Sequence, residues 1–242
     1  MAKKKETPEK SKDSLDQNRE IIQRLLASKS ALKQDVADDS EKVFDSLKEI
    51  IKKELDALRP LIKDERVRLS YEDRGKFEII VFIGSDMLVF HLHTNVFKLP
   101  DSNPLWGTKY FSSNENNGYF AVIHVYNFLA ESYLRNRFDD RGNLIARILT
   151  NQERHFMVEG KGQLGVLFRD PENTVLNDNY MKLMVQLSFA FALQFDLYIP
   201  PYEYLEEITI AQVLEISDSL KLQTGKRLGF KRQVEDIDNL QG

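Results

Sequence analysis

The chain has 242 residues and a formal net charge of −4, from 34 basic and 38 acidic side chains. Its 42% of apolar and 30% of charged residues are typical of a globular protein, and the length allows one large domain or two small ones. The chain holds no cysteine, which excludes disulfides, thiol catalysis, thiolate zinc sites and iron–sulfur clusters.

Charge and hydropathy also indicate which binding partners and which cellular location to expect for the protein. The small negative net charge disfavours binding of nucleic acid or anionic lipid over the whole surface. Residues 1–6 are charged and no apolar segment follows them, which predicts no secretory signal. No apolar run reaches the roughly 20 residues that a membrane span requires. We therefore expect a cytoplasmic protein without a membrane contact.

Residues 1–65 are far more charged than the rest of the chain. They carry 15 basic and 15 acidic side chains, so nearly half of them are ionised at zero net charge. The shift in composition near Glu65 predicts a domain boundary there. Residues 1–12 have almost nothing apolar to bury, which predicts a disordered basic tail before a charged helical arm over residues 13–65.

The arm holds two amphipathic helical patterns. Residues 13–33 show a narrow apolar stripe at helical spacing. A wider stripe follows Ser40 and ends near Arg59, because Pro60 stops or kinks a helix. We expect the two helices to form either an antiparallel hairpin or a coiled arm that holds copies of the chain together.

After the arm the apolar spacing changes, and it predicts a domain over residues 66–220 followed by a polar, flexible tail over residues 221–242. Residues 119–137 fit a helix, although their aromatic and β-branched first half would also suit a strand; we favour the helix. The expected order is three strands, a helix, three strands and two helices, at residues 67–71, 77–83, 87–97, 119–137, 144–149, 155–159, 163–168, 178–195 and 204–214.

This order predicts an α+β fold, with a mostly antiparallel sheet backed by helices and preceded by the helical hairpin or coiled arm. Over about residues 40–196 the element order resembles that of sensor-type domains such as PAS, GAF and roadblock domains. The resemblance lies in the element order and carries no sequence motif.

A long connection over residues 98–118 contains the only tryptophan and a polar run. Long connections in compact domains are usually functional or mobile. We therefore take Trp106, Tyr110 and Tyr119, which lie in or next to this connection, as the candidate ligand-binding residues.

Four residues form a candidate metal site. His91 and His93 are two apart on a predicted strand, so both imidazoles point to the same face. His155 and Glu159 share a face of another predicted strand and would complete a histidine and carboxylate ligand set if they lay alongside. The alternative, which we favour because a His-x-His pattern is common, is that these side chains are hydrogen-bonded and hold no metal.

Two further patterns point to phosphate chemistry. Residues 160–165 match Gly-x-Gly-x-x-Gly, but the residues from 163 predict a strand, which favours a tight turn over a dinucleotide site. Lys226, Arg227, Lys231 and Arg232 form a local basic patch that could bind phosphates, with a solvated tail as the simpler interpretation.

Taken together, these patterns favour a non-enzymatic regulatory module that binds a protein or a small ligand and self-associates into a homo-oligomer through its helical arm. They require no cofactor, and they leave open whether the protein is an enzyme. The first alternative is a metal-dependent hydrolase that uses the histidine and carboxylate site. The second is nucleic-acid binding through the C-terminal basic patch, which the net charge disfavours.

Overall fold

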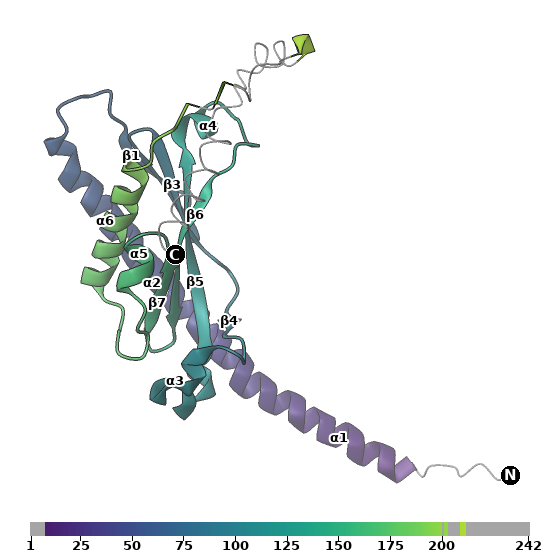
Figure 1. Cartoon of the computed structure of the whole chain (residues 1–242). Coiled ribbons are helices and arrows are strands. Elements are labelled where there is room, and N and C mark those ends of the chain that lie inside the picture. The colour runs from purple at the N-terminus through teal and green to yellow at the C-terminus, as the bar shows by residue number, and fades with distance from the viewer. Residues whose placement is uncertain (1–7, 200, 203–208, 212–242) are drawn as a thin grey trace.

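The computed structural model describes residues 8–199, 201–202 and 209–211 (Figure 1). In this part of the chain, seven strands form one antiparallel sheet, ordered β1-β2-β3-β5-β6-β7, with β4 paired to β5. The strands are β1 Leu69–Asp73, β2 Glu78–Ile83, β3 Asp86–Leu92, β4 Phe97–Lys98, β5 Tyr119–Leu129, β6 Asn143–Asn151 and β7 Phe156–Gly160. The predicted α+β class, with a mostly antiparallel sheet, is confirmed.

A single helical rod precedes the sheet. It consists of α1 Pro8–Leu25, a π-helical segment Leu26–Ser30 and α2 Ala31–Leu58, and a short 3-10 turn at Pro60 ends it. The rod does not reverse, so the predicted hairpin is wrong (Figure 1). The segment that was expected to turn contains no glycine or proline, and the Gln34 side chain bonds Asp38 one helical turn on, at 2.9 Å.

The second half of the rod belongs to the core of the domain. Phe44, Leu47, Ile51 and Leu55 of α2 are buried against the sheet and against α6 Asp178–Leu193. The structure therefore corrects the predicted boundary at Glu65, because α2 and the sheet share one hydrophobic core. The amphipathic stripe alone could not show this, since a stripe that packs on a sheet has the same spacing as one that packs on another helix.

Polar contacts also join α2 to the sheet. The Lys48 ammonium donates to the Gly75 carbonyl at 3.0 Å, and the Lys52 ammonium lies 3.1 Å from the Asp73 carboxylate. Both lysine side chains are less than a quarter exposed. These contacts fix the end of β1 on the middle of α2.

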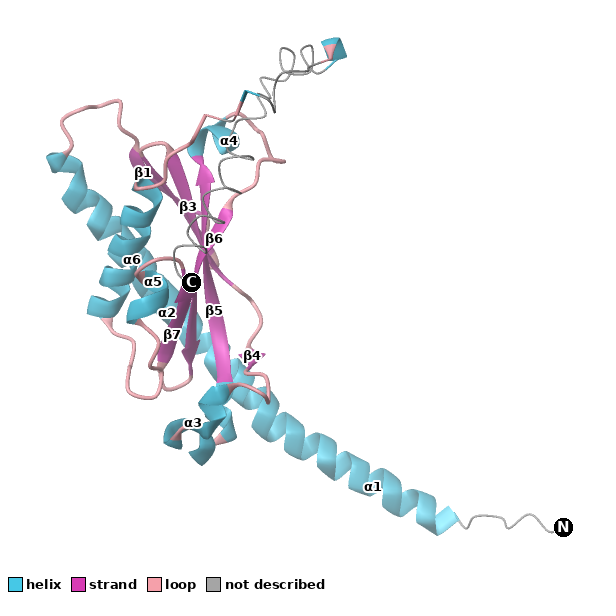
Figure 2. Cartoon of the chain, in the orientation of Figure 1, coloured by secondary structure: helices cyan, strands magenta, loops and turns pink. Residues whose placement is uncertain are grey.

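The helices α2 and α6 cover one face of the sheet, here called the covered face (Figure 2). The opposite face, here called the open face, is flanked at its ends by α4 Ala130–Leu134 and by the connection that contains α3 Lys109–Ser113 (Figure 1). Because side chains alternate along a strand, the register assigns each residue to one face. On β3, Leu88 and Phe90 join the covered core, whereas Val89 and His91 lie on the open face.

Two predicted elements are wrong. Residues 119–137 form the central strand β5 and then the short helix α4, rather than one long helix. The first half of β5 is buried on both faces, so the alternation that marks a strand is absent there. Residues 163–168 contain the short helix α5 Leu164–Leu167 instead of a strand, because Gly162 takes a positive φ of 54° that turns the chain out of the sheet.

The ends of the chain are only partly described. Residues 8–12 belong to α1, while residues 1–7 lie outside the description, so the disordered tail over residues 1–12 stays a prediction. Of the predicted helix over residues 204–214, only residues 209–211 are described, and the predicted tail at 221–242 lies wholly outside. Within the described ranges, no helix combines the length and the apolar character needed to cross a membrane.

Candidate functional site

The three aromatic residues predicted to bind a ligand do not form one site. Trp106 and Tyr110 pack on the hydrophobic cluster around Phe111 at one end of the open face. Tyr119 is buried on the covered face, against Leu32 of α2. β5 places Tyr119 and its successor on opposite faces, so adjacent positions in the sequence end on different sides of the sheet.

Trp106 packs the long connection over residues 98–118 against the sheet. Its indole Nε1 donates to the Pro100 carbonyl at 2.9 Å, and the Lys98 ammonium lies 5.5 Å from its ring centre. The ring covers Gly118 so closely that a β-carbon there would lie 2.2 Å from Cη2 of Trp106. These contacts give the tryptophan a structural role in holding residues 98–118.

Tyr110 and His155 form a second structural contact. Their rings stack at 4.0 Å between centres, and the Tyr110 hydroxyl donates to Glu153 at 2.8 Å and accepts from Asn151 at 2.9 Å. Burial raises the pKa of the Tyr110 hydroxyl, so it stays protonated. The Nδ1 atom of His155 lies 2.7 Å from the Pro171 carbonyl oxygen. The imidazole of His155 therefore contacts both the loop before α6 and the long connection over residues 98–118.

The predicted metal site is not assembled. His91 and His93 share the open face as expected, but His155 is occupied by Tyr110 and Pro171, and the Glu159 carboxylate pairs with Arg147. Among the residues that the structure describes, no group of three or more histidine, aspartate or glutamate side chains could hold a metal ion. The sequence could not reveal this, because the partner of each strand is set by the sheet topology.

The other two predicted motifs contribute no described site. The glycine motif at residues 160–165 makes a tight turn between β7 and the four-residue helix α5, in which a β-carbon at Gly165 would lie 2.0 Å from the Gly160 carbonyl oxygen. The basic patch of Lys226, Arg227, Lys231 and Arg232 lies outside the described residues.

The structure adds a histidine that the predicted set omitted. β5 pairs with β3 so that His124 lies directly opposite His91, and the ring centres of His93 and His124 are 6.0 Å apart. We call the side chains of His91, His93, His124 and Arg147 the histidine face. Had residues 119–129 been predicted as a strand, the sequence would have placed His124 on the face opposite to its neighbours Ile123 and Val125.

The surroundings of Nδ1 indicate which nitrogen carries the proton in the neutral rings of His93 and His124. The Asn95 backbone N–H donates to Nδ1 of His93 at 3.0 Å, so the neutral ring of His93 carries its proton on Nε2. Nδ1 of His124 is buried and has no hydrogen-bond partner in the described part of the chain. A buried N–H group without an acceptor costs more free energy than a buried nitrogen lone pair without a donor. We therefore place the proton of the neutral His124 ring on Nε2 as well.

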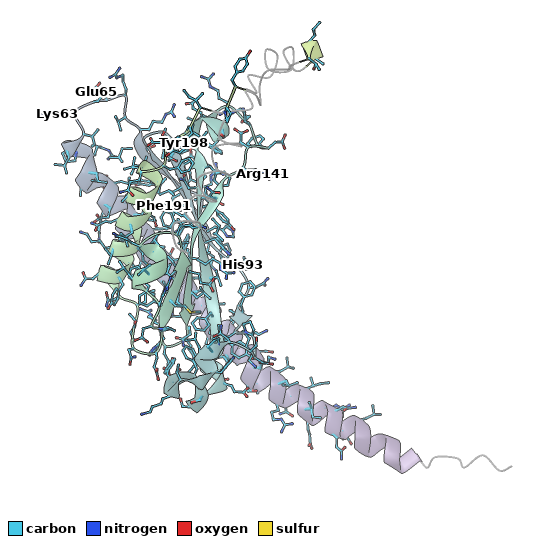
Figure 3. The ribbon with its side chains drawn as sticks, viewed as in Figure 1. Lys63, Glu65, His93, Arg141, Phe191 and Tyr198 are labelled. Carbon is cyan, nitrogen blue, oxygen red and sulfur yellow. The ribbon has the colours of Figure 1, made fainter. Side chains whose placement is uncertain are left out.

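Aromatic and charged neighbours surround the two imidazoles. The edge of His93 packs against Phe97 at 4.8 Å between ring centres, and Tyr126 stacks on His124 at 5.6 Å. Burial lowers the pKa of His124, and the nearby His93, Arg147 and His91 lower it further. His93 lies on the side of the sheet away from α6, which carries Phe191 (Figure 3).

A second unpartnered surface lies on the helical rod. α1 extends beyond the edge of the sheet (Figure 1), and every described side chain from residue 15 to residue 31 is exposed. Four apolar residues recur along it at helical spacing, with exposed fractions of 62%, 57%, 49% and 60% for Leu15, Ile22, Leu25 and Leu26. We call these four residues the α1 stripe.

No protein-family model matches the chain, and no curated protein or solved structure was found to match it. The fold and the two surfaces therefore define the class of protein: an α+β domain with one open sheet face and a projecting helix.

Proposed function

We propose that the protein is a non-enzymatic regulatory module that pairs two copies through α1 and binds a protein or a small ligand with its α+β domain. The exposed α1 stripe carries this proposal. Apolar side chains on a surface helix normally face a core, and contiguous exposed apolar surface marks an interaction site. A cytoplasmic location stays a prediction.

The energetics favour a partner for α1. The stability of helices in proteins comes mainly from packing of one apolar face, and the side chains of residues 15–31 are all exposed. Burial of a leucine or isoleucine side chain contributes about 1.5–3 kcal/mol. The four residues of the α1 stripe on each of two chains would therefore supply enough apolar burial to hold two helices together.

The charges of α1 favour a second copy as that partner. Between residues 15 and 30, Asp16 and Glu20 precede Arg24 and Lys29, and the one basic residue in the first part, Arg19, is paired with Asp16 at 3.0 Å. An antiparallel pair of identical helices places the acidic half of one against the basic half of the other. Such a surface is self-complementary, as a two-fold symmetric interface requires.

The two alternatives gain less support. The hydrolase needs His91, His93, His155 and Glu159 around one ion, and these side chains are held apart by other partners. Nucleic-acid binding depends on a patch that lies outside the described residues. A binding role for the domain is favoured by the donors and aromatic rings on the open face.

Light scattering after size-exclusion chromatography tests the pairing. We expect the unchanged chain to elute with twice the 28.2 kDa of one copy, and Ile22→Glu to elute as a single copy. The charged side chain cannot be buried between two helices without a large desolvation cost. A chain that is already single at high concentration would contradict the proposal.

Gln23→Glu is the matched control. It adds the same charge to α1, but its helical position is turned by about 100° from Ile22, away from the α1 stripe. We expect this variant to pair like the unchanged chain. Because residue 22 is exposed and far from the core, both variants should unfold at the same denaturant concentration as the unchanged chain. Equal pairing of both variants would show that α1 is not the interface.

A further inference from the structure

The open face brings three side chains with hydrogen-bond donors close together. His93 and His124 both carry their proton on Nε2, because Nδ1 of His93 accepts from the Asn95 N–H and Nδ1 of His124 is buried without an acceptor. Arg147 lies beside His124, and its Nε and Nη2 atoms donate hydrogen bonds to the Glu159 carboxylate. Its Nη1 amino group can therefore donate to a ligand. Strands β5 and β6 and the residue that follows β3 thus bring donors from distant parts of the sequence to one place.

We propose that the histidine face binds a compact oxyanion, the carboxylate or phosphate group of a small ligand, through the Nε2–H groups of His93 and His124 and the guanidinium of Arg147. The proposal rests on the ligand-binding half of the proposed function and does not require self-association. It names the chemical class of ligand that the domain would recognise.

The same proton positions argue against a cation. A metal ion is bound by the lone pair of an imidazole nitrogen. The lone pair of His93 at Nδ1 is engaged by the Asn95 N–H, and that of His124 at Nδ1 is buried. What both rings can offer to a ligand is an N–H group, which pairs with an acceptor. Hydrogen bonds to an ionised acceptor are about twice as strong as those between neutral groups.

The aromatic neighbours hold the donors in place. Phe97 packs against the edge of His93, and Tyr126 stacks on His124, so each imidazole has limited freedom to rotate. Donors that are fixed before a ligand arrives lose less conformational entropy on binding. The ion pair of Arg147 with Glu159 likewise orients the guanidinium at the edge of the histidine face.

Protons and the anion should bind cooperatively. A bound anion stabilises a protonated imidazole beside it, so affinity should rise as the pH falls, and the pKa of His124 should rise on binding. The titratable and charged groups around His124 come from β2, β3 and the residue after it, β5, β6 and β7, and they are Glu78, His91, His93, Tyr126, Arg147 and Glu159. The two glutamates oppose the anion, which makes the expected affinity modest.

Imidazole ¹H–¹⁵N spectra of the full chain provide the test. The sequence has only four histidines, and His155 is an internal control because its ring is held between Tyr110 and Pro171. Inorganic phosphate and acetate are titrated separately, with sodium chloride at matched ionic strength. We expect saturable shifts for His93 and His124 with at least one oxyanion, and an unchanged His155.

The two probes separate the two sources of the anionic group. Saturation by acetate alone identifies a carboxylate, saturation by phosphate alone identifies a phosphate, and either result supports the site. Shifts that are equal for all four histidines, or that chloride reproduces, would overturn it. Saturable shifts with zinc and none with the oxyanions would overturn it in favour of a cation.

Two variants complete the design. His93→Phe keeps an aromatic ring and removes the donor, and we expect about tenfold weaker binding, as loss of a hydrogen bond to a charged group predicts. His155→Phe keeps the stacking on Tyr110 and should bind normally. Ile22→Glu should also bind normally, so a failure of pairing and a failure of the anion site are distinguishable. Binding by His93→Phe equal to that of the unchanged chain would contradict the assignment.

Discussion

Gly118 shows how a single position holds the long connection in place. Trp106 lies on its α-carbon, and no side chain fits between them. The indole also bonds the Pro100 carbonyl, so the glycine and the tryptophan together fix both ends of residues 98–118. The residue that the sequence marked as a ligand contact is thus a structural one.

A substitution tests this packing. We expect Gly118→Ala to lower the free energy of unfolding by about 1–3 kcal/mol, because the added methyl group overpacks the site. Trp106 is the only tryptophan, so its fluorescence should also change, since the ring must move. Denaturant unfolding followed by fluorescence measures both effects.

Gly107→Ala is the control for this variant. It lies in the same connection, and an added β-carbon there would meet nothing within 4 Å. We expect its stability to stay within about 0.5 kcal/mol of the unchanged chain. Equal effects of the two substitutions would show that the contact with Trp106 does not matter.

At the scale of elements, the side chain of Glu54 joins α2 to α6 through polar contacts. Its carboxylate accepts from the Gln186 side chain at 2.7 Å and lies 3.0 Å from the Lys182 ammonium. Burial raises the pKa of Glu54, but the hydrogen bonds from Gln186 and Lys182 outweigh it, and the net pKa lies below the ordinary 4.5. The ionised form is therefore the form that stabilises the fold.

These polar contacts of Glu54 predict a dependence of stability on pH. A carboxylate whose pKa is lowered by folding stabilises above its unfolded pKa, and that contribution is lost as the pH falls through the folded pKa. We expect Glu54→Gln to lose about 1 kcal/mol at neutral pH, and the loss should shrink below pH 4.5. Denaturant unfolding at a series of pH values measures this difference.

Glu49→Gln provides the comparison on the same helix. The Glu49 side chain is 61% exposed and pairs only with Lys52 among the salt bridges described, so its removal should cost less than about 0.5 kcal/mol. A loss for Glu54→Gln that does not vary with pH would contradict the role given to its charge.

At the scale of the whole molecule, the rod has two parts with different roles. α2 lies in the core, and α1 projects from it (Figure 1). The change occurs just after the π-helical segment Leu26–Ser30. Residues 15–31 are all exposed, and Leu32 is the first buried residue among those of the rod whose side chains are described.

Truncation separates the two parts. We expect a chain that starts at residue 30 to unfold cooperatively near the temperature of the full chain and to elute as a single copy. A chain that starts at residue 66 should not fold, because it lacks the five apolar side chains of α2 that belong to the main core cluster. Each such side chain contributes about 2–5 kcal/mol, against a typical total stability of about 5–15 kcal/mol. Circular dichroism during heating distinguishes the two chains. Cooperative unfolding from residue 66 would restore the predicted boundary at Glu65.

Some features of the fold follow from local sequence patterns. The alternation at residues 87–97 predicts one strand and its two faces, of which the structure has β3 up to Leu92 and the separate β4 from Phe97. The stripe through Met181, Met184 and Val185 predicts α6. The spacing of apolar residues reports the period of the backbone where one face of an element is more deeply buried than the other, as in α6 and in the second half of β3. The α+β class follows from the order of such elements.

Tertiary structure decided what local patterns could not. β5 is central and buried on both faces in its first half, so its apolar run fits a helix as well as a strand. Only the sheet register brings His124 beside His91 and separates both from His155. Spacing along the chain fixes which residues share a face of one element, whereas contacts between elements depend on packing of surfaces that are distant in sequence. The sequence by itself therefore determined the class of fold and the amphipathic rods, and the three-dimensional packing determined which rod joins the core and which side chains meet.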